Sequence, residues 1–315
     1  MRAALVIGLC ILSNHTWAQR RMENTQINWS TVEAADATEI TAVRWLNGKD
    51  GPALVASSVR EGPGGAMDST LVFSGGAGLR VEMLTARQTL PSLPSWDVAL
   101  DAAGAPVFVY TDAGGAVNEL LLHGARGALP ITTGKPFESF HGPRFVRRAP
   151  GLPLIAIQDQ KHAVIFKSPG TTDGGHSAIL DCERALALAR ADRYALIYKT
   201  VVAGRPRANL IPPGALHFVE LDRELKALSK ATEPLGGAVV FEYDADLARV
   251  GTAILATTAG GTMLKVGDVS RSFNEPLPQN MTSPSVLVAG GRIYVAALER
   301  AQTQSARVVM AQLSE

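Results

Sequence analysis

Hydrophobic and polar positions alternate in short runs along most of the chain. Residues 96–111 are typical: two runs with a period of two flank a turn that contains Gly104 and Pro106, and the second run is rich in β-branched and aromatic side chains. A period of two indicates strands, and a short connection with glycine indicates a hairpin. This stretch therefore predicts a β-hairpin.

Five further pairs of runs repeat this hairpin pattern. They span residues 40–46 with 53–59, 144–147 with 152–158, 184–189 with 194–201, 238–243 with 251–257, and 285–288 with 293–298. The second runs begin at intervals of roughly 40–50 residues, the length of a four-stranded propeller blade. Two more strand-like runs follow each hairpin except the last, which has only residues 307–313.

Residues 27–33 precede the first hairpin and offer the missing strand. We expect them to pair with residues 307–313 and close the ring, because closure removes an exposed sheet edge. The alternative is a disordered N-terminal tail. The predicted fold is all-β: one domain over residues 19–315, a six-bladed β-propeller of four-stranded antiparallel blades.

Two stretches favour helix by composition. Residues 183–191 are rich in Ala and Leu, and residues 221–232 can be drawn as a short amphipathic helix. Because tertiary context overrides weak helix propensity, the repeat assigns both stretches to strands, the second as a strand over residues 226–231.

The N-terminus has the features of a secretory signal peptide, residues 1–18. Arg2 is followed by an apolar run over residues 3–12 and by small residues before a cleavage site after Ala18. The alternative, a membrane anchor, needs roughly 20 apolar residues. We expect a periplasmic or secreted protein of a Gram-negative bacterium, since Ala, Gly and Arg are abundant and Lys is scarce, with no membrane span.

Charge and cysteine content exclude several classes of protein. The chain has 30 basic and 29 acidic residues, which argues against nucleic acid as a partner. Beyond the signal peptide only Cys182 remains, so no internal disulfide can form and the thiol is expected to be buried. The histidines show no metal-ligand spacing, and we expect neither a metal nor another cofactor.

Three predicted turns between third and fourth strands carry a related pattern, at residues 74–78, 171–177 and 268–273. They resemble degenerate Asp-box turns, in which an Asp accepts backbone N–H bonds across a hairpin. On these motifs the chain resembles the sialidase-like, Asp-box (BNR) six-bladed β-propellers. The copies are incomplete: Ala178 replaces an aromatic residue in the second, and the first lacks an Asp. The resemblance implies that Asp173 and Asp268 are structural turn residues on the face opposite the active site.

Sialidase chemistry implies an arginine triad, a Tyr nucleophile activated by a Glu, and an Asp acid/base. The Arg-Ile-Pro motif expected in the first blade is absent, and residues 43–46 are the nearest stretch. We therefore carry over no catalytic residue from the family.

The loops between second and third strands, and those that lead into first strands, share one face of a propeller. This predicted loop face supplies polar and aromatic candidates for binding: Arg60, Trp96, Asp97, His141, Arg144, Arg205, Arg207, Asn209 and Arg300. Their mixture suits a protein or glycan partner, and ordinary solvated loops are the alternative. The leading hypothesis is an exported, non-catalytic binding propeller. A sialidase-like glycoside hydrolase or other hydrolase, with Asp97 or Glu138 in the channel, is the alternative, and a structural subunit of an envelope assembly is a third.

Overall fold

The computed structural model describes most of the predicted strands. It covers residues 27–28, 30–32, 40–48, 51–61, 67–74, 86–87, 96–112, 119–124, 127–131, 140–149, 151–158, 163–167, 176–177, 182–200, 214–274, 280–300 and 306–315. Those residues form strands β1 to β24 and no α-helix, so the all-β prediction is confirmed. The described residues contain no helix long and apolar enough to cross a membrane. Residues 1–18, the predicted signal peptide, lie outside the described residues.

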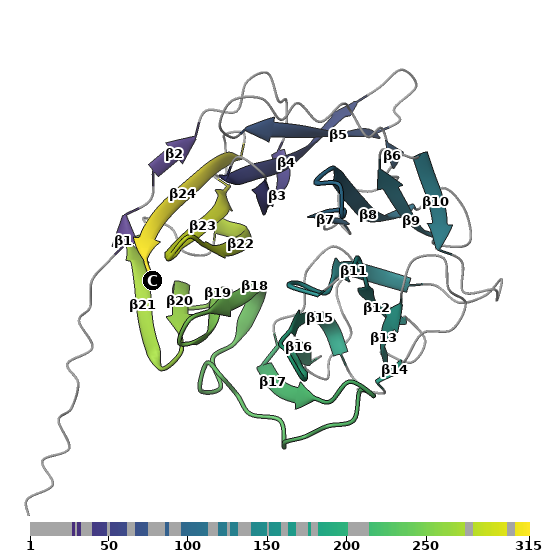
Figure 1. Cartoon of the computed structure of the whole chain (residues 1–315). Helices are drawn as coiled ribbons and strands as arrows, with labels where there is room; N and C mark the ends of the chain where they lie inside the picture. The colour runs from purple at the N-terminus through teal and green to yellow at the C-terminus, as the bar shows by residue number, and fades with distance from the viewer. Residues whose placement is uncertain are drawn as a thin grey trace, which may run out of the picture.

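The strands form six sheets grouped around a common centre (Figure 1). The first sheet contains β3 (Ile40–Gly48), β4 (Gly51–Glu61), β5 (Met67–Ser74) and β6 (Ala86–Arg87). The second contains β7 (Trp96–Leu100), β8 (Pro106–Asp112), β9 (Glu119–Gly124) and β10 (Gly127–Ile131). The third contains β11 (Phe140–Phe145), β12 (Leu154–Gln158), β13 (Ala163–Lys167) and β14 (His176–Ser177). The fourth sheet contains β15 (Cys182–Ala189), β16 (Tyr194–Thr200) and β17 (Leu216–Leu221). The fifth contains β18 (Val240–Ala248), β19 (Gly251–Thr258), β20 (Gly261–Val266), β21 (Val269–Asn274) and β1 (Ile27–Asn28). The sixth contains β22 (Met281–Ala289), β23 (Arg292–Glu299), β24 (Arg307–Ser314) and β2 (Ser30–Val32).

Within each sheet, strands that follow one another in sequence pair antiparallel. The first strand of each sheet also contacts the first strand of the next, from β3 through β7, β11, β15 and β18 to β22, and β22 contacts β3. We call these six strands the inner strands. Charged residues of these strands, discussed below, contact one another across the centre of the fold.

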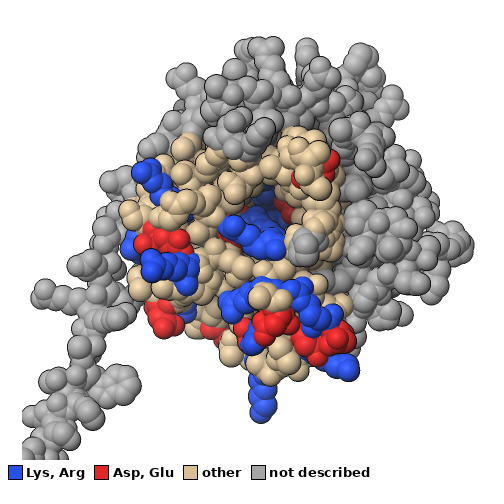
Figure 2. Space-filling view, viewed as in Figure 1, with Lys and Arg blue, Asp and Glu red and all other residues tan. Residues whose placement is uncertain are grey.

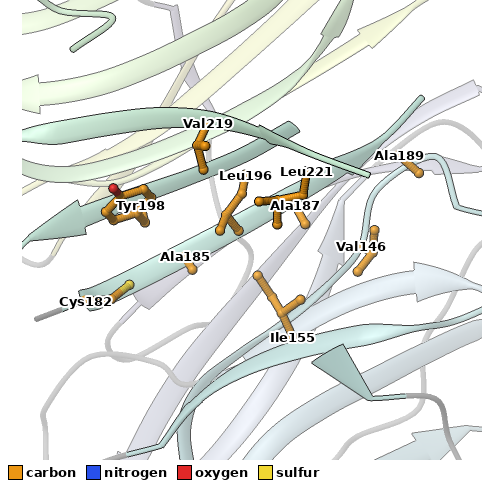
Figure 3. Close-up of a cluster of buried hydrophobic side chains, with 10 residues drawn as sticks. All are labelled: Val146, Ile155, Cys182, Ala185, Ala187, Ala189, Leu196, Tyr198, Val219 and Leu221. Atoms are coloured by element: carbon orange, nitrogen blue, oxygen red, sulfur yellow. The ribbon is translucent and has the colours of Figure 1, made fainter. Parts of the chain in front are cut away.

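The core consists of clusters between neighbouring sheets. Alternate residues of β15 belong to two of them. Ala185 and Ala187 pack with Ile155 of the third sheet (Figure 3). Leu186 and Leu188 pack with Tyr243 of the fifth sheet. Both faces of β15 are therefore apolar. This double burial explains the Ala- and Leu-rich composition that resembled a helix, and the strand assignment of residues 183–189 is confirmed.

The fourth strand predicted for the fourth sheet is not formed as a regular strand. Residues 226–231 follow the turn after β17. Two isolated bridges, Leu221 with Ala227 and Phe218 with Thr232, and a hydrogen bond from Leu228 N–H to Glu220 O join this part of the chain to β17 without forming a strand. The prediction of a strand over residues 226–231 is wrong. The segment is mostly exposed, so it has little apolar surface to bury against the sheet.

The N-terminal segment divides between two sheets, where a single strand was expected. Ser30 to Val32 pair antiparallel with β24, in the register Ser30 to Met310 and Val32 to Val308. Ile27 and Asn28 instead pair parallel with β21 of the fifth sheet. Ile27 is 8% exposed and packs in the cluster between the fifth and sixth sheets. Trp29 and Glu33 lie outside the described residues.

Candidate functional site

Charged and hydroxyl side chains occupy alternate positions of two inner strands, β18 and β22. On β18, Glu242, Asp244 and Asp246 alternate with Tyr243 and Ala245, which lie in the hydrophobic cluster between the fourth and fifth sheets. Because alternate residues of a strand point to opposite faces, the three acids share the face turned away from that cluster. All three are buried, which is rare for carboxylates without partners.

Asp244 is the centre of the buried polar contacts, and its carboxylate is fully buried. Arg144 Nη2 lies 2.6 Å from Oδ1, and Arg147 Nη2 lies 2.9 and 2.8 Å from the two carboxylate oxygens. The backbone N–H of Val286 donates to Oδ2 at 2.9 Å and the Ser285 hydroxyl at 3.2 Å. Burial alone would raise the pKa of Asp244, but Arg147, Arg144 and Arg44 lower it to about 2.

Asp97, on β7, extends these contacts to the second sheet. Its Oδ2 accepts the backbone N–H of Phe145 at 2.9 Å and lies 3.3 Å from Arg144 Nε. Arg144 therefore bridges two buried carboxylates, Asp97 and Asp244. Burial alone would lower the pKa of Arg144, but the two carboxylates raise it above the ordinary arginine value.

Arg44, on β3, brings in the first sheet. Its guanidinium lies 5.6 Å from the centroid of the Trp96 ring and donates to Val43 O at 2.8 Å. Its Nε is 4.0 Å from Asp97 Oδ1, an ion pair at the limit of contact. Burial, followed by repulsion from Arg144, lowers the pKa of Arg44 to about 10. We call Arg44, Asp97, Arg144, Arg147 and Asp244 the charge network.

The other two acids of β18 lie on either side of Asp244 along the strand. Asp246 accepts from Arg148 Nε at 3.0 Å and Nη2 at 2.6 Å, and from the backbone N–H of Val288 at 2.8 Å. Glu242 accepts the backbone N–H of Ser283. Among the acids of β18, Glu242 is the one without an ion pair to an arginine in the part of the chain that the structure describes.

Among the predicted binding residues that the structure describes, Asp97 and Arg144 are the pair joined by an ion pair. Both were expected where loops lead into first strands, and the structure places them within those strands, Asp97 in β7 and Arg144 in β11. Trp96 also lies in β7, is 5% exposed, and donates its ring N–H to Ser57 Oγ at 3.1 Å. A buried side chain of this kind cannot contact a partner on the surface.

The remaining predicted residues divide into strand ends, turns and undescribed loops. Arg60 lies in β4 opposite Asp68, His141 lies in β11, and Arg300 directly follows β23. Asp268 is exposed in the turn between β20 and β21, the position expected of an Asp-box residue, beside Gly267 with a positive φ of 56°. Asp173, Arg205, Arg207 and Asn209 lie outside the described residues.

Sequence reasoning missed Arg147, Arg148, Asp244 and Asp246. A signal for the acids was present in residues 241–247, FEYDADL, where an acid recurs at every second position of a strand-like run. An acid that alternates with buried residues must point into the protein or to solvent. Their arginine partners lie about 100 positions away in sequence, so the pairing itself has no local signal. The described residues contain no group of three or more His, Cys, Asp or Glu side chains that could hold a metal ion.

Solved structures with the same architecture include glycoside hydrolases. The GH93 α-L-arabinofuranosidase of Fusarium graminearum matches with a TM-score of 0.55 and 8% identity, over 90% of this chain and 96% of that one. The Hadza microbial sialidase Hz136 matches with a TM-score of 0.55 and 12% identity, over 88% of this chain and 66% of that one. A Trypanosoma rangeli sialidase complex matches with a TM-score of 0.51 and 8% identity, over 92% and 56%.

The fold is that of the sialidase-like β-propellers. This outcome confirms the resemblance found in the Asp-box turns. At these identities the likeness concerns the fold alone, and the chain spans just over half of the Trypanosoma rangeli sialidase. No protein-family model and no curated protein sequence matches the chain.

Proposed function

We propose that the protein is an exported, non-catalytic β-propeller that binds a protein or glycan partner. In this proposal the six sheets are the blades of a six-bladed ring, which β2 closes by pairing with β24. The antiparallel register of Ser30 to Val32 against Val308 to Met310 supports the closure. A periplasmic or extracellular location follows from the signal peptide expected over residues 1–18.

The observation that carries the non-catalytic proposal is the state of Asp244. Two arginines, a hydroxyl and a backbone N–H hold its carboxylate, and its pKa of about 2 keeps it ionised at neutral pH. A general acid for glycoside hydrolysis needs a raised pKa, so that it holds a proton to donate. Asp97, the acid expected to serve a hydrolase, is similarly bound to Arg144 and to the backbone of Phe145. These contacts support a structural role for both acids in place of a catalytic one.

The partner is proposed to bind on the predicted loop face, with Arg60, His141, Arg205, Arg207, Asn209 and Arg300 as its polar residues. The N–H of Arg300 donates to Asn280 O at 2.9 Å, so the chain after β23 and the chain before β22 lie side by side. This contact supports the expectation that loops after second strands and loops before first strands share a face. Arg300 Nε also donates to Thr282 Oγ1 at 3.3 Å, which orients the side chain there.

The test combines binding with turnover. The full chain is applied to a glycan array, and hydrolysis of fluorogenic α-sialoside and α-L-arabinofuranoside is measured in the same buffer. We expect a glycan to bind without turnover, and Arg300→Ala to weaken that binding. Arg292→Ala removes an exposed arginine from the opposite end of β23 and serves as the control. If no glycan binds, cross-linking in a periplasmic extract with the same two variants tests a protein partner. Equal effects of the two variants would refute the loop face.

A hydrolase is the second candidate, favoured by the match to the GH93 α-L-arabinofuranosidase over 90% of the chain. The acid to test is Glu242, because it is buried in an inner strand and no arginine among the described residues pairs with it. Glu242→Gln keeps an acceptor for the Ser283 N–H but removes the ionisable group. If the parent protein hydrolyses either glycoside and the folded Glu242→Gln variant does not, the protein is a hydrolase. This outcome would overturn the non-catalytic proposal.

A further inference from the structure

A second candidate site lies at the opposite ends of the inner strands from Arg300. It is a cavity of about 710 Å³ bordered by the turn between β15 and β16 and the turn between β18 and β19. Four arginines line it, and we call it the arginine pocket: Arg148, Arg190, Arg223 and Arg249. In Figure 2 basic side chains gather around and inside a hollow near the centre of the ring, with acidic side chains beside them.

Arg148 links the pocket to the centre of the fold. Its backbone adopts a φ of 64°, a left-handed conformation that is uncommon for a residue other than glycine. Hydrogen bonds between Arg147 and the backbone of Ala187 and Ala189, at 2.9 and 2.8 Å, fix the preceding residue. Asp246 binds Nε and Nη2 of Arg148, which leaves Nη1 available. The guanidinium is thus held rigidly while part of it faces the cavity.

Two more arginines are positioned by contacts that leave donors unused. Arg223 Nη2 donates to the carbonyls of Arg190 and Ala191 at 2.6 and 2.9 Å, and its guanidinium lies 4.7 Å from the centroid of the Tyr194 ring. Arg190 uses Nη1 to contact Glu220 at 3.1 Å. Since a guanidinium has five N–H donors, each of the two keeps donors for a ligand.

Arg249 is the least engaged of the four. Its backbone N–H donates to the Glu315 side chain, but its guanidinium makes no hydrogen bond or ion pair within the part of the chain that the structure describes. The residue is exposed at the turn between β18 and β19. Its side chain can therefore close on a ligand without breaking a contact of the fold.

The acids near the pocket do not line it. Asp246 contacts Arg148, Glu220 contacts Arg190 and Arg193, and Glu315 contacts the backbone of Arg249. The lining itself combines the four arginines with small or apolar residues, Ala189, Ala191, Leu247, Ala248 and Gly251. The charged groups that line the cavity are therefore all arginines.

We propose that the arginine pocket binds a small anion that carries two or more phosphate or carboxylate groups. Guanidinium groups match both oxyanions with paired hydrogen bonds, and four of them exceed what a single monoanion can use. The volume is within the range of pockets for small molecules, roughly 300–1,000 Å³. The site lies on the face opposite the proposed partner surface, so it does not depend on the function proposed above.

Titration calorimetry with the full chain tests the pocket. Pyrophosphate and citrate are the two probes, which separate phosphate from carboxylate recognition, and acetate is the monoanionic control. We expect at least one probe to bind with one site per chain, and acetate to bind at least about tenfold more weakly. Arg249→Ala should weaken the probe about tenfold, because one charge-assisted contact is lost. Arg249→Lys, which keeps the charge but loses the planar fork, should weaken it less.

Arg292→Ala is the matched control, since Arg292 is exposed as the first residue of β23 but does not line the pocket. Circular dichroism and the melting temperature of each variant establish that it is folded. The proposal is overturned if neither probe binds at millimolar concentration. It is also overturned if Arg292→Ala weakens binding as much as Arg249→Ala, because the effect would then be nonspecific attraction.

Discussion

Asp244→Asn is the substitution that most directly tests the charge network. The change preserves the shape of the side chain and leaves an oxygen that can accept the Val286 N–H. It removes the negative charge that Arg144 and Arg147 share at 2.6 to 2.9 Å. Both guanidinium groups contact this one carboxylate, and their side chains are only 11% and 14% exposed. Water therefore cannot fully replace the lost counter-charge.

The expected cost follows from this burial. Removing one partner of a buried ion pair destabilises a protein by about 3–5 kcal/mol, because the remaining charge is desolvated and uncompensated. A fold of this size is stable by only about 5–15 kcal/mol. Asp244→Asn should therefore remove a large fraction of the free energy of unfolding, or prevent folding at 37 °C.

Urea unfolding at pH 7, followed by tryptophan fluorescence, measures the loss. Asp192→Asn is the control, because Asp192 pairs with Arg193 on the surface, is 67% exposed, and should lose nothing measurable. A midpoint for Asp244→Asn that matches both the parent protein and the control would show that the network contributes no stability. The assignment of Asp244 to a structural role would then be wrong.

Other predictions follow from the same contacts and from the N-terminus. The pKa of Asp244 is about 2 in the folded protein, below the ordinary value of 3.8 that applies to the unfolded chain. Its contribution of about 2 kcal/mol to the free energy of unfolding is therefore complete above roughly pH 4 and is lost as the pH falls toward 2. Thermal unfolding across this range should show a steeper loss of stability for the parent than for Asp244→Asn. Deleting residues 1–34 should lower the melting temperature markedly, since Ile27 burial contributes roughly 2 kcal/mol and each lost ladder hydrogen bond about 1 kcal/mol, and a deletion that melts like the full mature chain would exclude ring closure by β2. Gly214→Ala should destabilise the fold strongly, as judged by urea unfolding, because a Cβ at that position would lie 1.9 Å from Thr200 O, and an unchanged midpoint would contradict this contact. Mass spectrometry of the exported protein should find Gln19 as its first residue, and an intact Met1 would refute the signal peptide.

The strands could be predicted from sequence because their side-chain pattern is local. The hairpin of residues 96–111 shows both runs and its turn within one short window, and the structure forms β7 and β8 there. The prediction of strand β15 needed the repeat as well. Both of its faces carry Ala and Leu, so its residues do not alternate between apolar and polar. The prediction for residues 226–231 was wrong for the opposite reason, because the repeat suggested a strand where the local sequence offers little apolar surface to bury.

The charge network could be predicted only in part. Asp97 and Arg144 were found because they lie near predicted strand starts and carry chemistry, but their burial was not foreseen. A charged residue at a strand start has the same local pattern whether it faces solvent or the centre of a ring. Only the arrangement of the inner strands around a common centre decides between the two, and that arrangement depends on contacts between strands far apart in sequence.

The network also explains how distant sheets are held together. Hydrophobic clusters join each sheet to its neighbours, as Ala187 joins the fourth sheet to the third. The ion pair of Arg144 with Asp244 instead crosses from the third sheet to the fifth, and that of Arg144 with Asp97 continues to the second. An arginine side chain is long enough to reach across the centre, and its buried charged end requires partners. The pairs of Arg144 with Asp97 and Asp244 therefore link three sheets directly, which is a structural reason for buried arginine and aspartate on the inner strands.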